Sequence, residues 1–200
     1  MFNYILPIYI TTMPLTLAGI ANSIILTYTP NLKTIRRPID NYLVLSDGKR
    51  LFGDNKTWLG LTGYIILSII FSLIWGFFCQ IIPNLGAKNL FYSSHSNSIY
   101  FNILIGLSLG AAYALFELPN SFLKRRFDIV PGKQSNQRSW QKYFFATLDH
   151  FDSAFGTILI IGLVHPLTWD FTILYLFLSG LTHWLIVKFL YLTKMRREHS

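Results

Sequence analysis

The sequence predicts an all-α, polytopic membrane protein with about five transmembrane helices. Of its 200 residues, 52% are hydrophobic and only 13% are charged, which is about half the charged share of an ordinary soluble domain. Few charges are needed where lipid is the solvent. The apolar residues form long runs, and the polar stretches between them are too short to fold alone. We therefore expect one integral membrane domain over residues 1–200.

Five apolar runs have the roughly 20 residues that a helix needs to cross the hydrocarbon core. In chain order they cover about Tyr4–Tyr28, Leu59–Ile82, Ile99–Leu118, Asp149–Trp169 and Phe171–Thr193. The last two runs nearly touch, so their link is predicted to be a tight helical hairpin.

Basic residues alternate between the two sides of this predicted bundle. The four links and the C-terminal tail contain 6, 1, 6, 0 and 3 Lys or Arg residues. The positive-inside rule therefore places the N-terminus outside and the C-terminus in the cytoplasm. The net charge of +8 lies in these short blocks, so we expect no nucleic-acid partner. Acidic residues gather on the same inner side, with only Asp170 outside, and the topology rule does not require this.

The first cytoplasmic link offers a candidate phosphate site. Its polar and glycine residues include Asp40, Gly53, Asp54, Asn55, Lys56 and Thr57. Glycine lets a backbone approach a ligand closely, and the free N–H groups at the start of the second span attract anions. The same basic loop could instead lie on anionic lipid headgroups. The residues alone leave both interpretations open.

The third link begins with a second cationic group, formed by Ser121, Lys124, Arg125 and Arg126. Arginine can hold a phosphate through two parallel hydrogen bonds, whereas lysine acts as a point charge. A basic flank beside a membrane span is the ordinary alternative.

Two acids, Asp149 and Asp152, are predicted to enter the fourth span together. Residues three apart share a helix face, so both carboxylates can point at one place. Mg²⁺ is commonly held by one or two carboxylates and the phosphates of a substrate. Helix capping would explain one Asp, but a second acid at the membrane edge favours a functional site.

Four segments, in this order, carry a resemblance to a known family. They are Arg37-Pro38-Ile39-Asp40, Leu51–Gly60, Ser121–Arg126 and Asp149–Ser153. Together they resemble the CDP-archaeol synthase family, a branch of the phosphatidate cytidylyltransferase-like membrane enzymes. The last two segments are similar to the Ser-x-x-Lys-Arg and Asp-Arg-x-Asp-Ser signatures of the wider family.

The resemblance implies transfer of a cytidylyl group from CTP to a membrane lipid phosphate, giving a CDP-lipid and pyrophosphate. It implies Mg²⁺ as the cofactor, with Asp149 and Asp152 as ligands and Glu117 as a third candidate where the family usually carries Asp. The implied catalytic residues are Lys56, Lys124, Arg125, Asp149 and Asp152. The implied substrate-binding residues are Asp40, Gly53, Asp54, Asn55, Thr57, Ser121 and Arg126.

The expected partners are CTP, a lipid phosphate acceptor and membrane lipids, and a homodimer is left open. The expected location is the cell membrane, with a multi-pass chain and an active site on the cytoplasmic face. One alternative is a protein of the same fold that binds lipid or nucleotide without catalysis. A small transporter is another, although transporters usually show repeated halves and charge near the membrane midplane. His183 is interpreted as a hydrogen-bonding residue between helices.

Overall fold

The computed structural model describes residues 2–28, 36–131, 139–193 and 195. Within these residues, five helices are long and apolar enough to cross a membrane. They are α1 (Ile5–Tyr28), α2 (Trp58–Ile81), α4 (Ile99–Arg126), α5 (Ser139–Val164) and α6 (Trp169–Leu192). Shorter elements are η1 (Phe2–Tyr4), α3 (Pro83–Lys88) and η2 (Leu90–Ser93). The predicted all-α membrane fold is confirmed, and the described residues form only isolated β-bridges.

Small residues bring the long helices close together. A Cβ added to Gly106 of α4 would lie 2.7 Å from the Ile69 Cα of α2. A Cβ added to Gly156 of α5 would lie 2.6 Å from the carbonyl oxygen of Ala112 in α4. Within a lipid bilayer the hydrophobic effect does not drive helices together, so close van der Waals packing of this kind holds them instead. The spacing of α4 against α2 and α5 is therefore tightly set.

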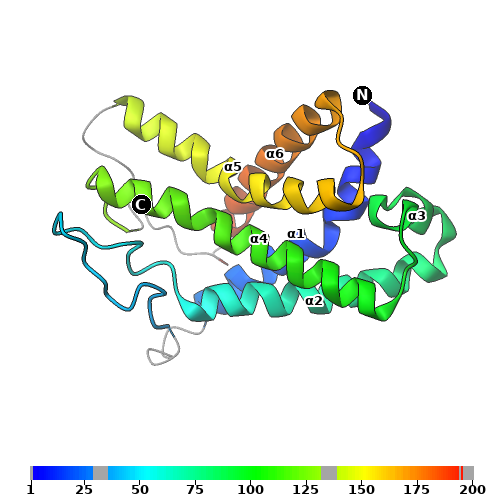
Figure 1. Ribbon diagram of the computed structural model, residues 1–200, viewed down its shortest axis with the longest axis horizontal. Helices are drawn as coiled ribbons and strands as arrows, with labels where there is room; N and C mark the ends of the chain where they lie inside the picture. Colours follow the sequence, from blue (N-terminus) through cyan, green and yellow to red (C-terminus); the bar gives the residue numbers. More distant parts are fainter. Residues whose placement is uncertain (1, 29–35, 132–138, 194, 196–200) are drawn as a thin grey trace.

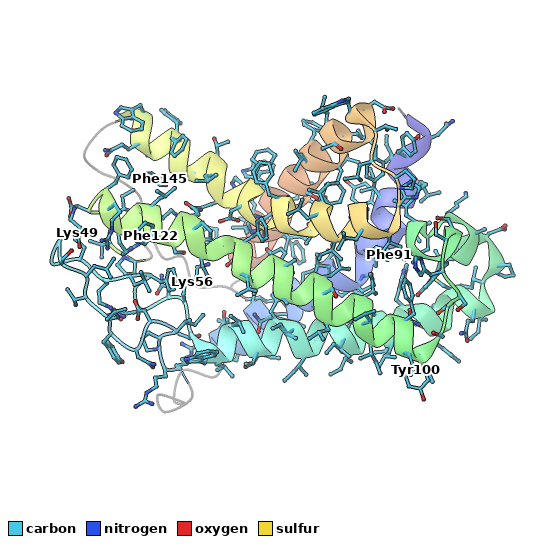
Figure 2. All side chains as sticks on the ribbon, in the orientation of Figure 1. Lys49, Lys56, Phe91, Tyr100, Phe122 and Phe145 are labelled. Atoms are coloured by element: carbon cyan, nitrogen blue, oxygen red, sulfur yellow. The ribbon has the colours of Figure 1, made fainter. Side chains whose placement is uncertain are left out.

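The polar segments lie at opposite ends of the bundle (Figure 1). The link formed by residues 36–57 lies at one end, beside the C-terminal end of α4, and α3 and η2 lie at the other. Figure 2 shows Lys49, Lys56 and Phe122 at the first end and Phe91 and Tyr100 at the second. The end that carries Lys49 and Lys56 is called the basic end below.

Two predicted helix boundaries are wrong. The helix that begins at Ile99 continues through Pro119 to Arg126, rather than ending near Leu118. The following helix begins at Ser139, rather than near Asp149. Hydropathy marks where the chain enters hydrocarbon, and both helices extend past that point. Asp149 and Asp152 consequently lie well inside α5, so neither acid caps the helix.

Candidate active site

Asp149 and Asp152 of α5 converge on one side chain of α4. The Asn120 Nδ2 donates to Asp149 Oδ1 at 2.7 Å and to Asp152 Oδ2 at 2.8 Å. Asn120 and Asp152 are both buried. The two carboxylates therefore do point at one place, as their spacing of three residues predicts.

Two ammonium groups complete the cluster. The Lys124 Nζ donates to Asp149 Oδ2 at 2.6 Å, and Lys56 forms an ion pair with Glu117. Burial alone would lower the pKa of Lys56, but the charge of Glu117, with contributions from Asp152 and Asp149, raises it. Lys56 therefore stays charged in its ion pair with Glu117. We call Lys56, Glu117, Asn120, Lys124, Asp149 and Asp152 the acid–lysine cluster.

Helix periodicity explains how α4 contributes three members of this cluster. Glu117, Asn120 and Lys124 follow one another at steps of three and four residues, so they lie on one face. Asn120 was not predicted from the sequence as a site residue. The sequence did contain a signal for it, because Asn120 lies three residues after Glu117 and four before Lys124, on the same helix face.

Asp40 organises the link before α2. Its fully buried carboxylate accepts from the backbone N–H groups of Tyr42, Phe52 and Gly53 at 2.9–3.1 Å, and from Arg50 Nη2 at 2.6 Å. Burial opposes ionisation, but these donors together lower the pKa of Asp40 to about 2. The carboxylate is thus occupied by the loop itself and fixes the turn that precedes Lys56.

Arg126 and Lys49 fasten this link to the end of α4. Arg126 forms an ion pair with Asp47 and donates from Nη2 to the Arg50 carbonyl oxygen at 2.5 Å. Lys49 Nζ donates to the Arg126 carbonyl oxygen and to Asp128 Oδ1, both at 2.8 Å. The loop and the helix end therefore form one unit at the basic end.

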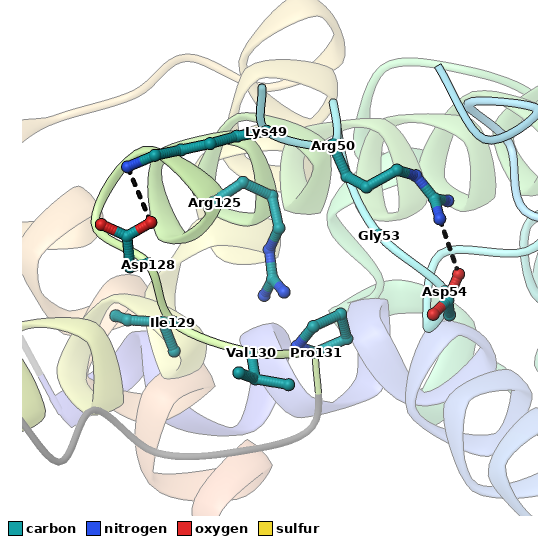
Figure 3. Close-up of a pocket in the computed structure, with 9 residues that line it drawn as sticks. All are labelled: Lys49, Arg50, Gly53, Asp54, Arg125, Asp128, Ile129, Val130 and Pro131. Carbon is teal, nitrogen blue, oxygen red and sulfur yellow. Dashed lines mark hydrogen bonds and ion pairs between the residues drawn. The ribbon is translucent and has the colours of Figure 1, made fainter. Parts of the chain in front are cut away.

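A pocket of about 250 Å³ opens between the link and the turn after α4, and Figure 3 shows its lining. The Arg125 guanidinium points into it, between the Lys49–Asp128 and Arg50–Asp54 ion pairs. Within the described part of the chain, Arg125 Nε and Nη1 are buried without a hydrogen-bond partner. Such donors are costly unless water or a bound acceptor group satisfies them, and phosphate oxygens are acceptors that suit a guanidinium.

Gly53 shapes the wall of this pocket. Its φ of +94° lies in the region that favours glycine. An added Cβ would lie 2.8 Å from Pro131 Cγ and 3.5 Å from Arg125 Nη1. No larger residue fits here without moving the pocket wall.

The remaining predicted substrate residues lie around these two centres. The Thr57 hydroxyl accepts from Gly60 N at 3.1 Å and so caps α2. Ser121 Oγ donates to the Glu117 carbonyl oxygen at 3.0 Å. Asp54 pairs with Arg50 at 3.0 Å, and both Asp54 and Asn55 are exposed. The structure therefore joins the lysines and acids directly and leaves these polar residues at the periphery.

The acid–lysine cluster has donors that suit a hard divalent cation. Among the described residues, no group of three His, Cys, Asp or Glu side chains is placed to hold a metal. The available set is the Asp149–Asp152 pair together with the amide of Asn120. Its oxygen atoms match the preference of Mg²⁺, which completes its shell with water and phosphate.

The comparisons with known proteins agree on one family. A family model described as CarS-like, CDP-archaeol synthase, matches residues 2–198. A CDP-archaeol synthase of Pyrococcus furiosus is 27% identical over 184 residues, covering 92% of this chain and 86% of that protein. One of Methanoculleus marisnigri is 33% identical over 129 residues, covering 64% of this chain and 65% of that protein.

A solved structure has the same fold. It is described as an intramembrane enzyme for archaeal membrane lipids biosynthesis, and it matches with a TM-score of 0.58 and 23% identity. The match covers 88% of this chain and 90% of that chain. Because the family model spans almost the whole sequence, the chain belongs to the CDP-archaeol synthase family.

Proposed function

We propose that this chain is a cytidylyltransferase that joins CTP to a lipid phosphate of the archaeol type in the membrane, giving a CDP-lipid and pyrophosphate. The observation that carries the proposal is the convergence of Lys56, Lys124, Asp149 and Asp152 at the basic end. These groups come from separate segments of the chain, yet they form one cluster beside the Arg125 pocket. The cationic side chains of the acid–lysine cluster and of the Arg125 pocket suit a reaction between two anions, CTP and a lipid phosphate.

The reaction needs positioning and charge neutralisation more than covalent help from the protein. An oxygen of the lipid phosphate attacks the α-phosphorus of CTP, and the bond from that phosphorus to the β-phosphate bridging oxygen breaks. The electron pair leaves with pyrophosphate. Asp149 and Asp152 are the residues that would hold Mg²⁺, which when bound supplies positive charge to the phosphate oxygens.

Lys56 and Lys124 supply the mobile positive charge. In this structure each ammonium is paired with a carboxylate, Glu117 or Asp149. An arriving phosphate gives each lysine an alternative anionic partner at the same place. We assign these lysines to the reacting phosphates, where a compact ammonium can follow the charge as it moves to the leaving group.

Arg125 is assigned to the phosphates of the nucleotide. Its Nε and Nη1 atoms are buried and have no hydrogen-bond partner among the described residues. The pocket that the guanidinium enters is also lined by Gly53 and by two ion pairs, Lys49–Asp128 and Arg50–Asp54.

We place the basic end in the cytoplasm, where CTP is found, because the positive-inside rule assigns the basic links to that side. Single cysteines in a Cys79→Ser background test this placement. Ser46→Cys at the basic end and Ser94→Cys at the other end are both exposed positions. In sealed, right-side-out vesicles an impermeant maleimide should label Ser94→Cys and spare Ser46→Cys, and the opposite pattern would reverse the placement.

The activity is tested with purified protein, labelled CTP, Mg²⁺ and a panel of lipid phosphates. The panel contrasts isoprenoid ether-linked glycerol phosphate with diacyl glycerol phosphate. We expect a CDP-lipid with one pyrophosphate per product, formed fastest from the isoprenoid ether lipid. Binding of CTP or lipid with no pyrophosphate from any acceptor would instead support a non-catalytic binding protein.

A further inference from the structure

Asn120 is the one neutral member of the acid–lysine cluster, and both ends of its amide are informative. Its nitrogen Nδ2 touches both Asp149 and Asp152, at 2.7 and 2.8 Å. Its oxygen Oδ1 is buried and has no hydrogen-bond partner among the described residues. A buried carbonyl without a partner is destabilising, because it has lost its hydrogen bonds to water. This orientation is therefore favourable on one side of the amide and costly on the other.

We propose that Asn120 is a third oxygen ligand of the divalent cation, and that its amide group rotates when the cation binds. This inference rests on the metal site of the proposed function. Rotation of about 180° around the Cβ–Cγ bond exchanges Oδ1 and Nδ2, which have nearly the same shape. Oδ1 then stands beside the two carboxylates.

Electrostatics makes this rotation depend on the cation. Without positive charge between them, an amide oxygen beside the oxygens of Asp149 and Asp152 would be repelled, so the N–H₂ group faces the acids. With a divalent cation in place, the N–H₂ group is repelled and the carbonyl dipole is attracted. Amide carbonyls and carboxylates together form the all-oxygen surroundings that hard cations take in proteins.

The helices have little room to supply this adjustment by moving closer together. Gly156 of α5 approaches the Ala112 carbonyl of α4 so closely that an added Cβ would lie 2.6 Å from it. The backbones of α4 and α5, which carry Asn120 and the two acids, are therefore already in close contact near Gly156. Rotation of one side chain is the smallest change that converts a donor into a ligand at this point.

Two substitutions at Asn120 separate a ligand from a hydrogen-bond donor. Asn120→Ala removes both functions. Asn120→Asp keeps an oxygen ligand and abolishes the N–H donor, and it adds a negative charge beside the acids. A donor role predicts that both variants bind Mn²⁺ more weakly than the wild type, because both lose the N–H₂ group. A ligand role predicts that Asn120→Ala loses Mn²⁺ affinity and that Asn120→Asp keeps it.

The measurement is Mn²⁺ binding to the purified protein, read from the electron paramagnetic resonance signal of free Mn²⁺. We expect Asn120→Ala to weaken Mn²⁺ binding by about 10-fold or more, and Asn120→Asp to bind Mn²⁺ within about threefold of the wild type, or more tightly. Asn97→Ala, in the polar network at the opposite end of the bundle, is the control and should bind like the wild type.

Thermal unfolding supplies a second readout, measured once in chelator and once with Mn²⁺. In chelator, Asn120→Asp should unfold at a lower temperature than the wild type, and Mn²⁺ should raise its midpoint by more than it raises the midpoint of the wild type. If Asn120→Asp bound Mn²⁺ no more tightly than Asn120→Ala, the role of Asn120 as a ligand would be overturned, but the metal site would not. A wild type that binds no Mn²⁺ would overturn the metal site as well.

Discussion

Replacing Asp40 by asparagine should loosen the link that carries Gly53 and Lys56. The Asp40 carboxylate is fully buried and accepts hydrogen bonds from three backbone N–H groups and from Arg50. Its pKa falls from 3.8 to about 2, which corresponds to about 2 kcal/mol of preference for the ionised form. An amide at this position keeps the shape of the side chain and loses that preference, since it carries no charge and one of its two acceptors becomes a donor.

Amide hydrogen exchange measures this loss where it occurs. The N–H groups of Phe52 and Gly53 donate to Asp40, so their peptide reports opening of the loop. If opening becomes easier by about 2 kcal/mol, exchange in the Asp40→Asn variant should be about 30-fold faster. Peptides from α2 and α4 should keep the exchange rates of the wild type.

Asp54→Asn is the matched control, because Asp54 also pairs with Arg50, at 3.0 Å, but its side chain is 66% exposed. An exposed pair contributes about 0–1 kcal/mol, so exchange in the same peptide should rise by less than about fivefold. Exchange in the Asp40→Asn variant that stays within about twofold of the wild type would refute the view that Asp40 organises this loop.

Three further predictions concern the same end of the molecule. Gly53→Ala should weaken CTP binding by about 10-fold or more, because its Cβ would lie 2.8 Å from Pro131 Cγ. Gly48→Ala also places alanine at a positive φ but meets nothing within 4 Å, so equal losses in a CTP titration would contradict this reading of the pocket. Thr57→Ala should lower the free energy of unfolding by about 1 kcal/mol through loss of the α2 cap, and Thr57→Ser should restore it in a denaturant titration. Asp40, whose pKa is lowered to about 2 on folding, should contribute stability that is complete above about pH 4 and lost as pH falls towards 2; thermal midpoints that are flat across this range would exclude that contribution.

The sequence was sufficient for the membrane fold and for the pairing of the two acids. Long apolar runs and alternating basic links are direct consequences of lipid solvation, so five spans could be recognised without a structure. The spacing of Asp149 and Asp152 places them on one helix face wherever the helix begins. That prediction is therefore correct even though α5 begins earlier than predicted, at Ser139.

Contacts between segments could not be predicted in the same way. Lys124 and Arg125 are neighbours in sequence, yet a rotation of about 100° per residue sends Lys124 to Asp149 and Arg125 into the pocket. From the sequence, the two residues were predicted to form one cationic group. Asn120 was missed for a related reason, since its role depends on two acids that lie 29 and 32 residues away. Only the packing of α5 on α4 brings them together.

The proposed function depends most on the two carboxylates of α5 acting in cytidylyl transfer. The most direct measurement is the rate of CDP-lipid formation from labelled CTP by the wild type, Asp149→Asn, Asp152→Asn and the control Asp170→Asn, which changes an exposed acid in the first turn of α6. Each of the first two substitutions should slow product formation on the order of 100-fold or more, while Asp170→Asn keeps the rate of the wild type. Turnover that is unchanged in Asp149→Asn and Asp152→Asn would contradict the account.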